Sequence, residues 1–208
     1  MKCVIFSAAK IADYGFITSD EYSNALIICA DAGYEHVKHL GLTPQLIVGD
    51  FDSLGQAPKI EAEIIHHPAE KDDTDTMLAV KVAIERGATE IVIFGGIGDR
   101  LDHTYANIST LLYASLHGAK ACLKASNCKV MLHTNASEIQ ISRGNWDFVS
   151  LFAYSDKCEG VSIQGVKYPL ADATLTTDFP LGVSNEFAGE HAVISVKSGY
   201  LLIMLTRE

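Results

Sequence analysis

Residues 46–53, Leu46-Ile47-Val48-Gly49-Asp50-Phe51-Asp52-Ser53, join a short apolar run directly to a pair of acidic side chains. An apolar run without polar alternation is typical of a strand that is buried on both faces of a sheet. Comparable runs occupy residues 3–7, 25–30 and 91–94. Each of these four segments is therefore predicted to be a buried strand.

Helical spacing separates these runs. Residues 33–40, 75–86 and 103–117 place apolar side chains three and four positions apart, and Gly87 and Gly118 follow the last two segments as stop signals. Strands that alternate with helices form parallel sheets through right-handed crossovers. We therefore expect an α/β fold with a mostly parallel sheet in the first part of the chain.

The pattern changes after residue 130, where no long helical period remains. Short apolar segments bounded by Gly, Asn, Asp or Pro occupy residues 139–141, 148–152, 161–163, 174–176, 192–196 and 201–205. This pattern predicts antiparallel β structure. We expect an α/β domain of residues 1–130 and a β domain of residues 131–208, with a soft boundary near residues 127–136. The second domain is small for independent stability, so we expect it to be stabilised by packing against the first domain or against a second copy in a dimer.

The composition limits the possible partners. The 208 residues are 48% apolar and 20% charged, and 26 acidic against 16 basic residues give a net charge of -10. This acidity argues against nucleic acid or an anionic membrane as a partner and favours a small neutral or cationic substrate. The five scattered cysteines indicate neither a disulfide framework nor a zinc site. With no signal peptide and no apolar run of about 20 residues, we expect a cytoplasmic protein.

Acidic residues stand just past several predicted strands, in the groups Asp50 and Asp52, Asp72 and Asp75, and Asp102. The carboxyl ends of parallel strands meet at one edge of the sheet, where open α/β folds bind ligands. Two carboxylates about 4 Å apart repel by roughly 4 kcal/mol at an effective dielectric near 20, so such a cluster favours a shared hard cation. Mg²⁺ suits these ligands and suggests phosphate chemistry. Taken singly, each group also fits an ordinary turn, helix cap or acidic first turn.

The loop Gly95-Gly96-Ile97-Gly98-Asp99-Arg100 lies between a predicted strand and a predicted helix. Its glycines would let backbone N–H groups approach phosphate oxygens, and Arg100 would supply a bidentate donor. The spacing matches neither a P-loop nor the dinucleotide fingerprint, and such a loop also fits a simple tight turn. Asp102 and His103 open the predicted helix that continues through Asn107. They could contact a ligand, or they could be a helix cap and a surface histidine without a functional role.

Taken together and in order, these groups resemble the thiamine pyrophosphokinase family of the bacterial type. The resemblance rests on Asp31-Ala32-Gly33, residues 49–53, residues 71–75, and Gly98 to His103 with Asn107. In the second half it rests on residues 160–161 and 165–170 and on Gly182-Val183-Ser184-Asn185-Glu186, which is otherwise readable as a hairpin turn. It covers nearly the whole chain.

The resemblance implies an α/β catalytic domain and a β-sandwich domain, assembled as a homodimer that holds thiamine at the subunit junction. The reaction would move the pyrophosphoryl group of ATP to the hydroxyl of thiamine and leave AMP. Mg²⁺ and the triphosphate would be bound by Asp50, Asp52, Asp72 and Asp75. Further nucleotide contacts would come from Asp31, Gly33, Thr74, Gly98, Arg100, Asp102, His103 and Asn107. Thiamine would be bound by Ser184 and Asn185, and Asp72 is the candidate acceptor of the hydroxyl proton.

Two positions depart from the family pattern, and two other functions compete with the kinase. Ala32 replaces a usual glycine, which is tolerated if the backbone keeps an ordinary φ. Asp99 also replaces a glycine, and its carboxylate would be placed to pair with Arg100. A metal-dependent phosphohydrolase would use the same aspartates on water, and a non-catalytic thiamine-binding regulator would keep the fold without the reaction.

Overall fold

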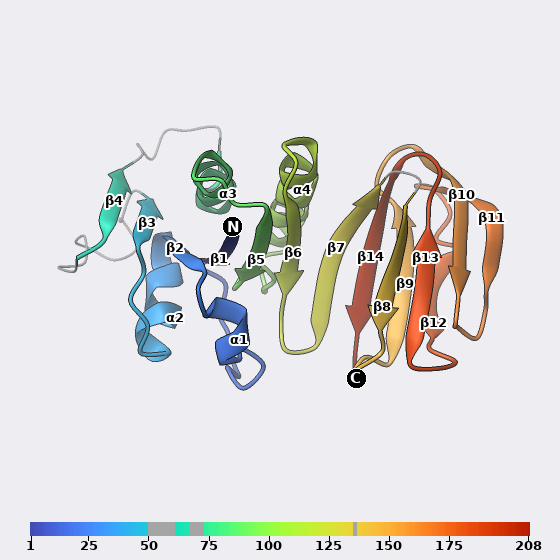
Figure 1. Ribbon diagram of the computed structural model, residues 1–208, viewed down its shortest axis with the longest axis horizontal. Coiled ribbons are helices and arrows are strands. Elements are labelled where there is room, and N and C mark those ends of the chain that lie inside the picture. Colours follow the sequence, from blue (N-terminus) through green and yellow to red (C-terminus); the bar gives the residue numbers. More distant parts are fainter. Residues whose placement is uncertain (50–60, 67–72, 135–136) are drawn as a thin grey trace. The chain divides into compact units, whose positions relative to one another are not determined.

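Two folding units divide the chain, one formed by residues 1–126 and the other by residues 127–208. The computed structural model describes residues 1–49, 61–66, 73–134 and 137–208, and Figure 1 draws the others in grey. Three residues proposed from the sequence, Asp50, Asp52 and Asp72, lie outside the described residues. The predicted fold class is confirmed, with a parallel sheet in the first unit and antiparallel sheets in the second.

The sheet of the first unit has the strand order β6-β5-β1-β2-β3-β4, and every neighbouring pair is parallel. Its strands are β1 (Lys2–Phe6), β2 (Leu26–Ala30), β3 (Leu46–Gly49), β4 (Glu63–His66), β5 (Glu90–Phe94) and β6 (Lys120–Lys124). The four predicted strands correspond to β1, β2, β3 and β5, which lie inside the sheet. Strands β4 and β6 were not predicted, because as the outer strands of this unit they mix charged and apolar residues.

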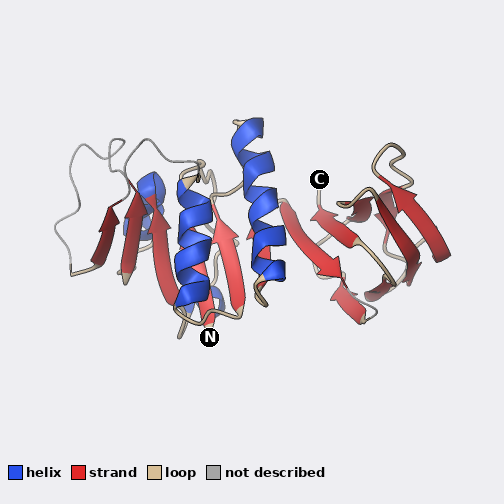
Figure 2. Ribbon diagram, turned by 90° about the horizontal axis from the view of Figure 1, so that it is seen from above, coloured by secondary structure: helices blue, strands red, loops and turns tan. Residues whose placement is uncertain are grey.

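Helices cover both faces of this sheet (Figures 1 and 2). They are α1 (Ser19–Tyr22), the 3₁₀ turn η1 (Asp31–Gly33), α2 (Tyr34–His39), α3 (Asp75–Glu85) and α4 (Leu101–Leu116). The chain adds β2, β3 and β4 on one side of β1 and then adds β5 and β6 on the other side. Because right-handed crossovers that run in opposite directions place their helices on opposite faces, α1 and α2 cover one face and α3 and α4 the other.

An apolar cluster on the α1 and α2 face holds the neighbouring strands β1 and β5 together. Phe6 of β1 and Phe94 of β5 are fully buried, and their ring centroids lie 5.4 Å apart. Val37 of α2 packs into the same cluster. Loss of a buried aromatic ring typically costs about 3–5 kcal/mol, so this contact fixes the strand ends that follow Phe6 and Phe94.

The second unit is a sandwich of two antiparallel sheets with the strand orders β12-β9-β14-β7 and β11-β10-β13-β8. Its strands are β7 (Cys128–Thr134), β8 (Glu138–Ser142), β9 (Phe148–Ala153), β10 (Lys157–Gln164), β11 (Leu170–Thr176), β12 (Gly182–Glu186), β13 (His191–Ser195) and β14 (Tyr200–Thr206). One buried core takes side chains from both sheets, among them Leu151 and Ile203 from the first and Ile163 and Ile194 from the second. Within the described ranges, no helix is long and apolar enough to cross a membrane.

Candidate active site

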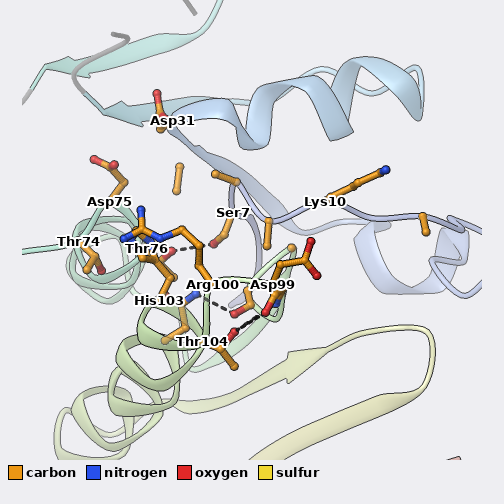
Figure 3. Close-up of a pocket in the computed structure, with 18 residues that line it drawn as sticks. Ser7, Lys10, Asp31, Thr74, Asp75, Thr76, Asp99, Arg100, His103 and Thr104 are labelled. Carbon is orange, nitrogen blue, oxygen red and sulfur yellow. Dashed lines mark hydrogen bonds between the residues drawn. The ribbon is translucent and has the colours of Figure 1, made fainter. Parts of the chain in front are cut away.

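A pocket of about 720 Å³ lies where the direction of chain progression in the parallel sheet reverses, beside β1 and β5. Such a switch point leaves a crevice outside the carboxyl ends of the strands, which is the usual ligand site of open α/β sheets. The lining comes from the loops after β1 and β5, the end of β2, and the first turns of α3 and α4 (Figure 3). The sequence predicted this edge of the sheet as the site.

The loop after β1 forms one wall of the pocket through residues 7–10 and Ala12. Ser7 and Ala9 donate their backbone N–H groups to the carbonyl oxygens of Phe94 and Gly95, at 2.8 and 2.9 Å. The buried hydroxyl of Thr76 in α3 donates to the Ser7 hydroxyl at 2.9 Å. This wall was missed from the sequence, because Ser-Ala-Ala carries no distinctive chemistry. Its one signal was its place after the first strand.

The loop after β5 lies so close to this wall that it requires glycine. Gly95 has a φ of +64°, and a Cβ there would lie 2.3 Å from the Ser7 carbonyl oxygen. A Cβ on Gly98 would lie 2.7 Å from the Cβ of Ala9. Side chains would therefore push the two loops apart, which explains the glycines that the sequence analysis singled out.

The first turns of α4 hold the glycine loop in place. Asn107, which is 6% exposed, donates its side-chain amide to the Gly96 carbonyl oxygen at 2.8 Å. The Thr104 hydroxyl oxygen accepts from the Gly98 N–H at 3.1 Å. Asn107 thus lines the pocket and also supports its backbone, and Thr104 is a lining residue that the sequence analysis did not select.

Arg100 and His103 line the pocket, whereas Asp102 does not belong to the lining. The Arg100 guanidinium donates to the Asp102 carboxylate at 2.7 Å, and this hydrogen bond lowers the pKa of the Asp102 carboxyl. Both side chains are largely exposed, so the pair adds little to stability. Asp99, which we expected to pair with the arginine, lines the pocket, and the arginine pairs with Asp102 instead.

Besides Asp99 in the glycine loop, two carboxylates reach the pocket from neighbouring elements. Asp31 follows β2 with a φ of +47° and is 8% exposed, and its buried Oδ1 atom has no hydrogen-bond partner among the described residues. Asp75 opens α3 directly after Thr74, whose hydroxyl oxygen caps the helix by accepting from the Met77 N–H at 3.2 Å. Figure 3 shows Asp31, Asp75 and Thr74 on one side of the pocket and Lys10 on the other.

These carboxylates suit a hard cation, which takes oxygen ligands and would satisfy the unpartnered oxygen of Asp31. Within residues 1–49, 61–66, 73–134 and 137–208, no cluster of three or more His, Cys, Asp or Glu side chains is arranged to hold a metal. Of the four predicted Mg²⁺ ligands only Asp75 is described, so the set remains a prediction. Asp73 points elsewhere and pairs with Lys81 at 2.5 Å.

Gly33 lies outside the pocket lining and has a packing role instead. A Cβ at this position would lie 1.9 Å from the Phe6 carbonyl oxygen, so only glycine lets α2 approach the end of β1. Neighbouring Ala32 keeps an ordinary negative φ. It is not among the non-glycine residues of the described chain that have a positive φ, which are Asn24, Asp31, Asp172 and Ser184. The substitution of the usual glycine at position 32 is therefore tolerated.

Ser184 and Asn185 lie on β12 of the second unit. Asn185 is 7% exposed, and its side-chain amide accepts from the Tyr168 N–H at 3.0 Å and donates to the Tyr168 carbonyl oxygen at 2.7 Å. Ser184 has a φ of +55° and an exposed side chain, and its N–H donates to the Ser150 hydroxyl oxygen at 2.9 Å. The pairing of β12 with β9 shifts its register between Gly182 and Asn185, so Ser184 lies at an irregularity of the strand. Asn185 holds the backbone of Tyr168, whose side chain is exposed.

Comparison with known proteins identifies the family. Residues 20–123 match the model of the thiamin pyrophosphokinase catalytic domain, and residues 136–201 match that of the thiamin pyrophosphokinase vitamin B1 binding domain. The chain is 31% identical to thiamine pyrophosphokinase of Bacillus subtilis over 200 residues, which cover 89% of this chain and 88% of that protein. It is 25% identical to thiamin pyrophosphokinase 1 of Caenorhabditis elegans over 167 residues, which cover 76% of this chain and 68% of that protein.

A solved structure shows the same architecture. The crystal structure of the Bacillus subtilis thiamine pyrophosphokinase superposes with a TM-score of 0.88 at 26% identity, and the match covers 100% of both chains. The motifs quoted from the sequence, the two matched domains and the fold lead to one conclusion. The chain belongs to the thiamin pyrophosphokinase family.

Proposed function

We propose that this chain transfers the pyrophosphoryl group of ATP to the hydroxyl of thiamine in the pocket beside β1 and β5, giving thiamine diphosphate and AMP. The observation that carries the proposal is the pocket itself, in which the carboxylates of Asp31, Asp75 and Asp99 and a glycine loop meet at the switch point of the parallel sheet. The unit that contains this sheet also contains the match to the catalytic domain. The matched B1-binding domain supplies the second substrate class. We keep residues 1–130 as the proposed ATP domain and residues 131–208 as the proposed thiamine domain.

The phosphate groups of ATP fit the side of the pocket formed by the glycine loop and the first turn of α4. Backbone N–H groups at a helix start favour phosphate oxygens, and the glycines let these oxygens come close. Lys10 and Arg100 are the Lys and Arg side chains of the described lining, and His103 lies beside them. We assign them to charge neutralisation around the triphosphate, with Arg100 held in orientation by Asp102.

The reaction needs charge stabilisation more than covalent chemistry. The thiamine hydroxyl oxygen attacks the β-phosphorus, the bond from that phosphorus to the bridging oxygen of the α-phosphate breaks, and AMP leaves. Negative charge grows on the phosphate oxygens, and cationic groups fixed around them lower the barrier. The hydroxyl proton passes to a carboxylate, for which Asp72 remains our candidate.

We assign Mg²⁺ binding to Asp75 together with Asp50, Asp52 and Asp72, and the unpartnered oxygen of Asp31 makes it a further ligand candidate. A bound Mg²⁺ ion would neutralise phosphate charge and hold the triphosphate in line for attack. Asp75 fits this role because it lines the pocket at the start of α3.

Thiamine is assigned to the second unit, where Ser184 and Asn185 lie within the match to the B1-binding domain. The cationic thiazolium suits a chain with a net charge of -10. We further propose a homodimer with thiamine at the subunit junction. Exposed apolar side chains on both units support an interface, among them Leu101 and Tyr105 on α4 and Tyr168 and Phe179 in the second unit. The five free cysteines fit the cytoplasm, which we propose as the location.

Measurement of AMP tests the proposal. The purified chain is incubated with ATP and Mg²⁺, with and without thiamine, and AMP and thiamine diphosphate are quantified. A kinase forms both products in equal amounts only when thiamine is present. AMP without thiamine would instead indicate the phosphohydrolase, and thiamine binding without AMP in either mixture would indicate the regulator. Sedimentation of the same sample gives the oligomeric state, and a monomer that retains full activity would rule out the shared site.

A further inference from the structure

A buried histidine outside the pocket holds the loop after β1. His36 of α2 is 7% exposed, and its Nε2 atom lies 3.0 Å from the carbonyl oxygen of Ala9. Its Nδ1 atom lies 2.7 Å from the hydroxyl oxygen of Tyr14, in the segment that follows the same loop. One imidazole ring therefore connects α2 with two points of the chain segment that forms a wall of the pocket.

The chemistry of the two partners fixes the tautomer of His36. A carbonyl oxygen can only accept, so Nε2 must carry the proton that it donates to Ala9. In the neutral ring Nδ1 is then an acceptor, and the Tyr14 hydroxyl donates to it. Protonation of Nδ1 would turn this acceptor into a second donor, so the Tyr14 hydroxyl oxygen would have to accept a hydrogen bond from the ring instead of donating one.

The surroundings of His36 favour the neutral ring. Burial lowers its pKa, and nearby His39 acts in the same direction, whereas the carbonyl groups of Ala9 and Ser7 and the charge of Glu35 oppose the shift. Tyr14 stacks on His39 with ring centroids 4.2 Å apart, and burial raises the pKa of its hydroxyl. The imidazole is therefore set to act as one donor and one acceptor at neutral pH.

Ala9 is held from both sides as a result. Its carbonyl oxygen accepts from His36, and its N–H donates to the Gly95 carbonyl oxygen at 2.9 Å. A Cβ on Gly98 would lie 2.7 Å from the Cβ of Ala9, which shows how closely Ala9 packs against the glycine loop. Ala9 and Lys10 both line the pocket. The placement of this wall thus depends on a side chain that does not itself line the pocket.

We propose that His36 is a positioning residue for the nucleotide, holding Ala9 against the glycine loop so that this wall and Lys10 meet the phosphate groups. The inference rests on the proposed function, because it assumes that the pocket binds ATP. It extends that function by adding a residue from α2, an element that provides no side chain to the pocket lining.

Paired variants separate the two hydrogen bonds. His36→Gln keeps a donor near the Nε2 position for the Ala9 carbonyl, whereas His36→Asn keeps an acceptor near Nδ1 for Tyr14 and loses the donor. We expect His36→Asn to raise KM for ATP about tenfold, with kcat and KM for thiamine nearly unchanged, because one buried carbonyl loses its partner. His36→Gln should restore KM for ATP to within about twofold of the wild type. The control is His39→Phe, which keeps an aromatic ring against Tyr14 on the exposed side of α2.

The pH profile supplies a readout that a purely structural role would not change. Burial disfavours the charged ring, so protonation of His36 favours conformations in which the imidazole leaves its place beside Ala9. Wild-type KM for ATP should therefore rise as the pH falls below 6.5, the ordinary histidine value from which the pKa of His36 is lowered. His36→Gln should lack the part of this rise that belongs to the imidazole, while the titration of ATP itself affects both proteins equally.

Several results would overturn the inference. It fails if His36→Asn lowers kcat or thermal stability but leaves KM for ATP unchanged, or if His36→Gln is as impaired as His36→Asn. Binding of a non-hydrolysable ATP analogue by calorimetry separates this failure from that of the proposed function. A wild-type chain that does not bind the analogue contradicts the nucleotide site itself, whereas tight binding that is equal in the wild type and His36→Asn contradicts only the role of His36.

Discussion

The side-chain amide of Asn107 donates to the carbonyl oxygen of Gly96 at 2.8 Å, so α4 holds the glycine loop from below through a buried hydrogen bond. We expect Asn107→Asp to lower kcat/KM for ATP about tenfold or more, because a carboxylate cannot donate to the Gly96 carbonyl and repels it. Steady-state kinetics with varied ATP would measure the loss. Kinetics equal to the wild type would show that the loop keeps its shape without this bond.

Asp75 and Asp73 allow a matched test of the metal role. Asp75 lines the pocket, whereas Asp73 pairs with Lys81 outside the lining. Asp75→Asn should fold normally and lose activity by about 100-fold or more, because a neutral amide replaces a carboxylate that we assign to Mg²⁺ and is a weaker ligand for this ion. Asp73→Asn, with the same chemical change two residues earlier, should stay within about twofold of the wild type. Thermal melts and AMP formation for both variants give the comparison, and wild-type turnover by Asp75→Asn would contradict its assignment to Mg²⁺.

Two glycines with nearly the same backbone separate conformational strain from close contact. Gly95 and Gly41 have φ values of +64° and +66°, but a Cβ on Gly41 meets nothing within 4 Å. Gly41→Ala should cost about 1 kcal/mol of unfolding free energy and leave KM for ATP unchanged. Gly95→Ala should cost more and also raise KM for ATP, because its Cβ would lie 2.3 Å from the Ser7 carbonyl oxygen. Urea unfolding and kinetics on both variants measure the difference, and equal destabilisation would mean that the close contact relaxes freely.

Asn185 is expected to act on thiamine alone. Its amide makes two hydrogen bonds to the backbone of Tyr168, so Asn185→Ala leaves this segment without its support. We expect KM for thiamine to rise about tenfold while binding of an ATP analogue is unchanged. Calorimetric titration of each substrate would separate the two sites. A loss of ATP binding equal to the loss of thiamine binding would contradict the division of roles.

The buried His36 also predicts how stability depends on pH. Its folded pKa lies below the value of 6.5 that the unfolded chain has, so below pH 6.5 the unfolded chain binds more protons than the folded chain. The contribution of His36 to the unfolding free energy should therefore be fully present above pH 6.5, and it should be lost as the pH falls through the folded pKa. Asp102 and Asp178, whose pKa values are lowered from 3.8, contribute losses only at still lower pH. Urea unfolding at several pH values between 7.5 and 5 gives the unfolding free energy as a function of pH. This free energy should fall less with decreasing pH in His36→Gln than in the wild type, and an equal fall in both proteins would contradict a histidine that is buried in its neutral form.

The parts of the fold that were predicted are those in which burial leaves a strong pattern. Strands β1, β2, β3 and β5 lie inside the parallel sheet, and two buried faces require continuous apolar residues. Strands β4 and β6 carry Glu63 and Lys120 at exposed positions, so this pattern is absent. Strand β12 was missed for a related reason, because Val183 and Ser184 are exposed at the edge of its sheet.

The lining of the candidate site could be predicted where residues carry recognisable chemistry and was missed where only the backbone matters. Asp31, Thr74, Asp75, Gly98, Arg100, His103 and Asn107 line one pocket as expected. The wall made by Ser7 to Lys10 was missed, because its contribution comes from backbone hydrogen bonds and close packing, to which small residues give no sequence signal. The contact of His36 with Ala9 joins residues far apart in the chain, and no local pattern reveals it.

The conformation of Asp31 carries a consequence for the evolution and engineering of this enzyme. A left-handed backbone at a residue with a side chain, together with a buried oxygen that has no partner among the described residues, makes this fold less stable than the same fold with glycine at that position. Selection for heat resistance alone would therefore tend to replace Asp31, and under the ligand role proposed for this carboxylate such variants should lose turnover. Variants selected for higher thermal stability should therefore first be checked for replacement of Asp31.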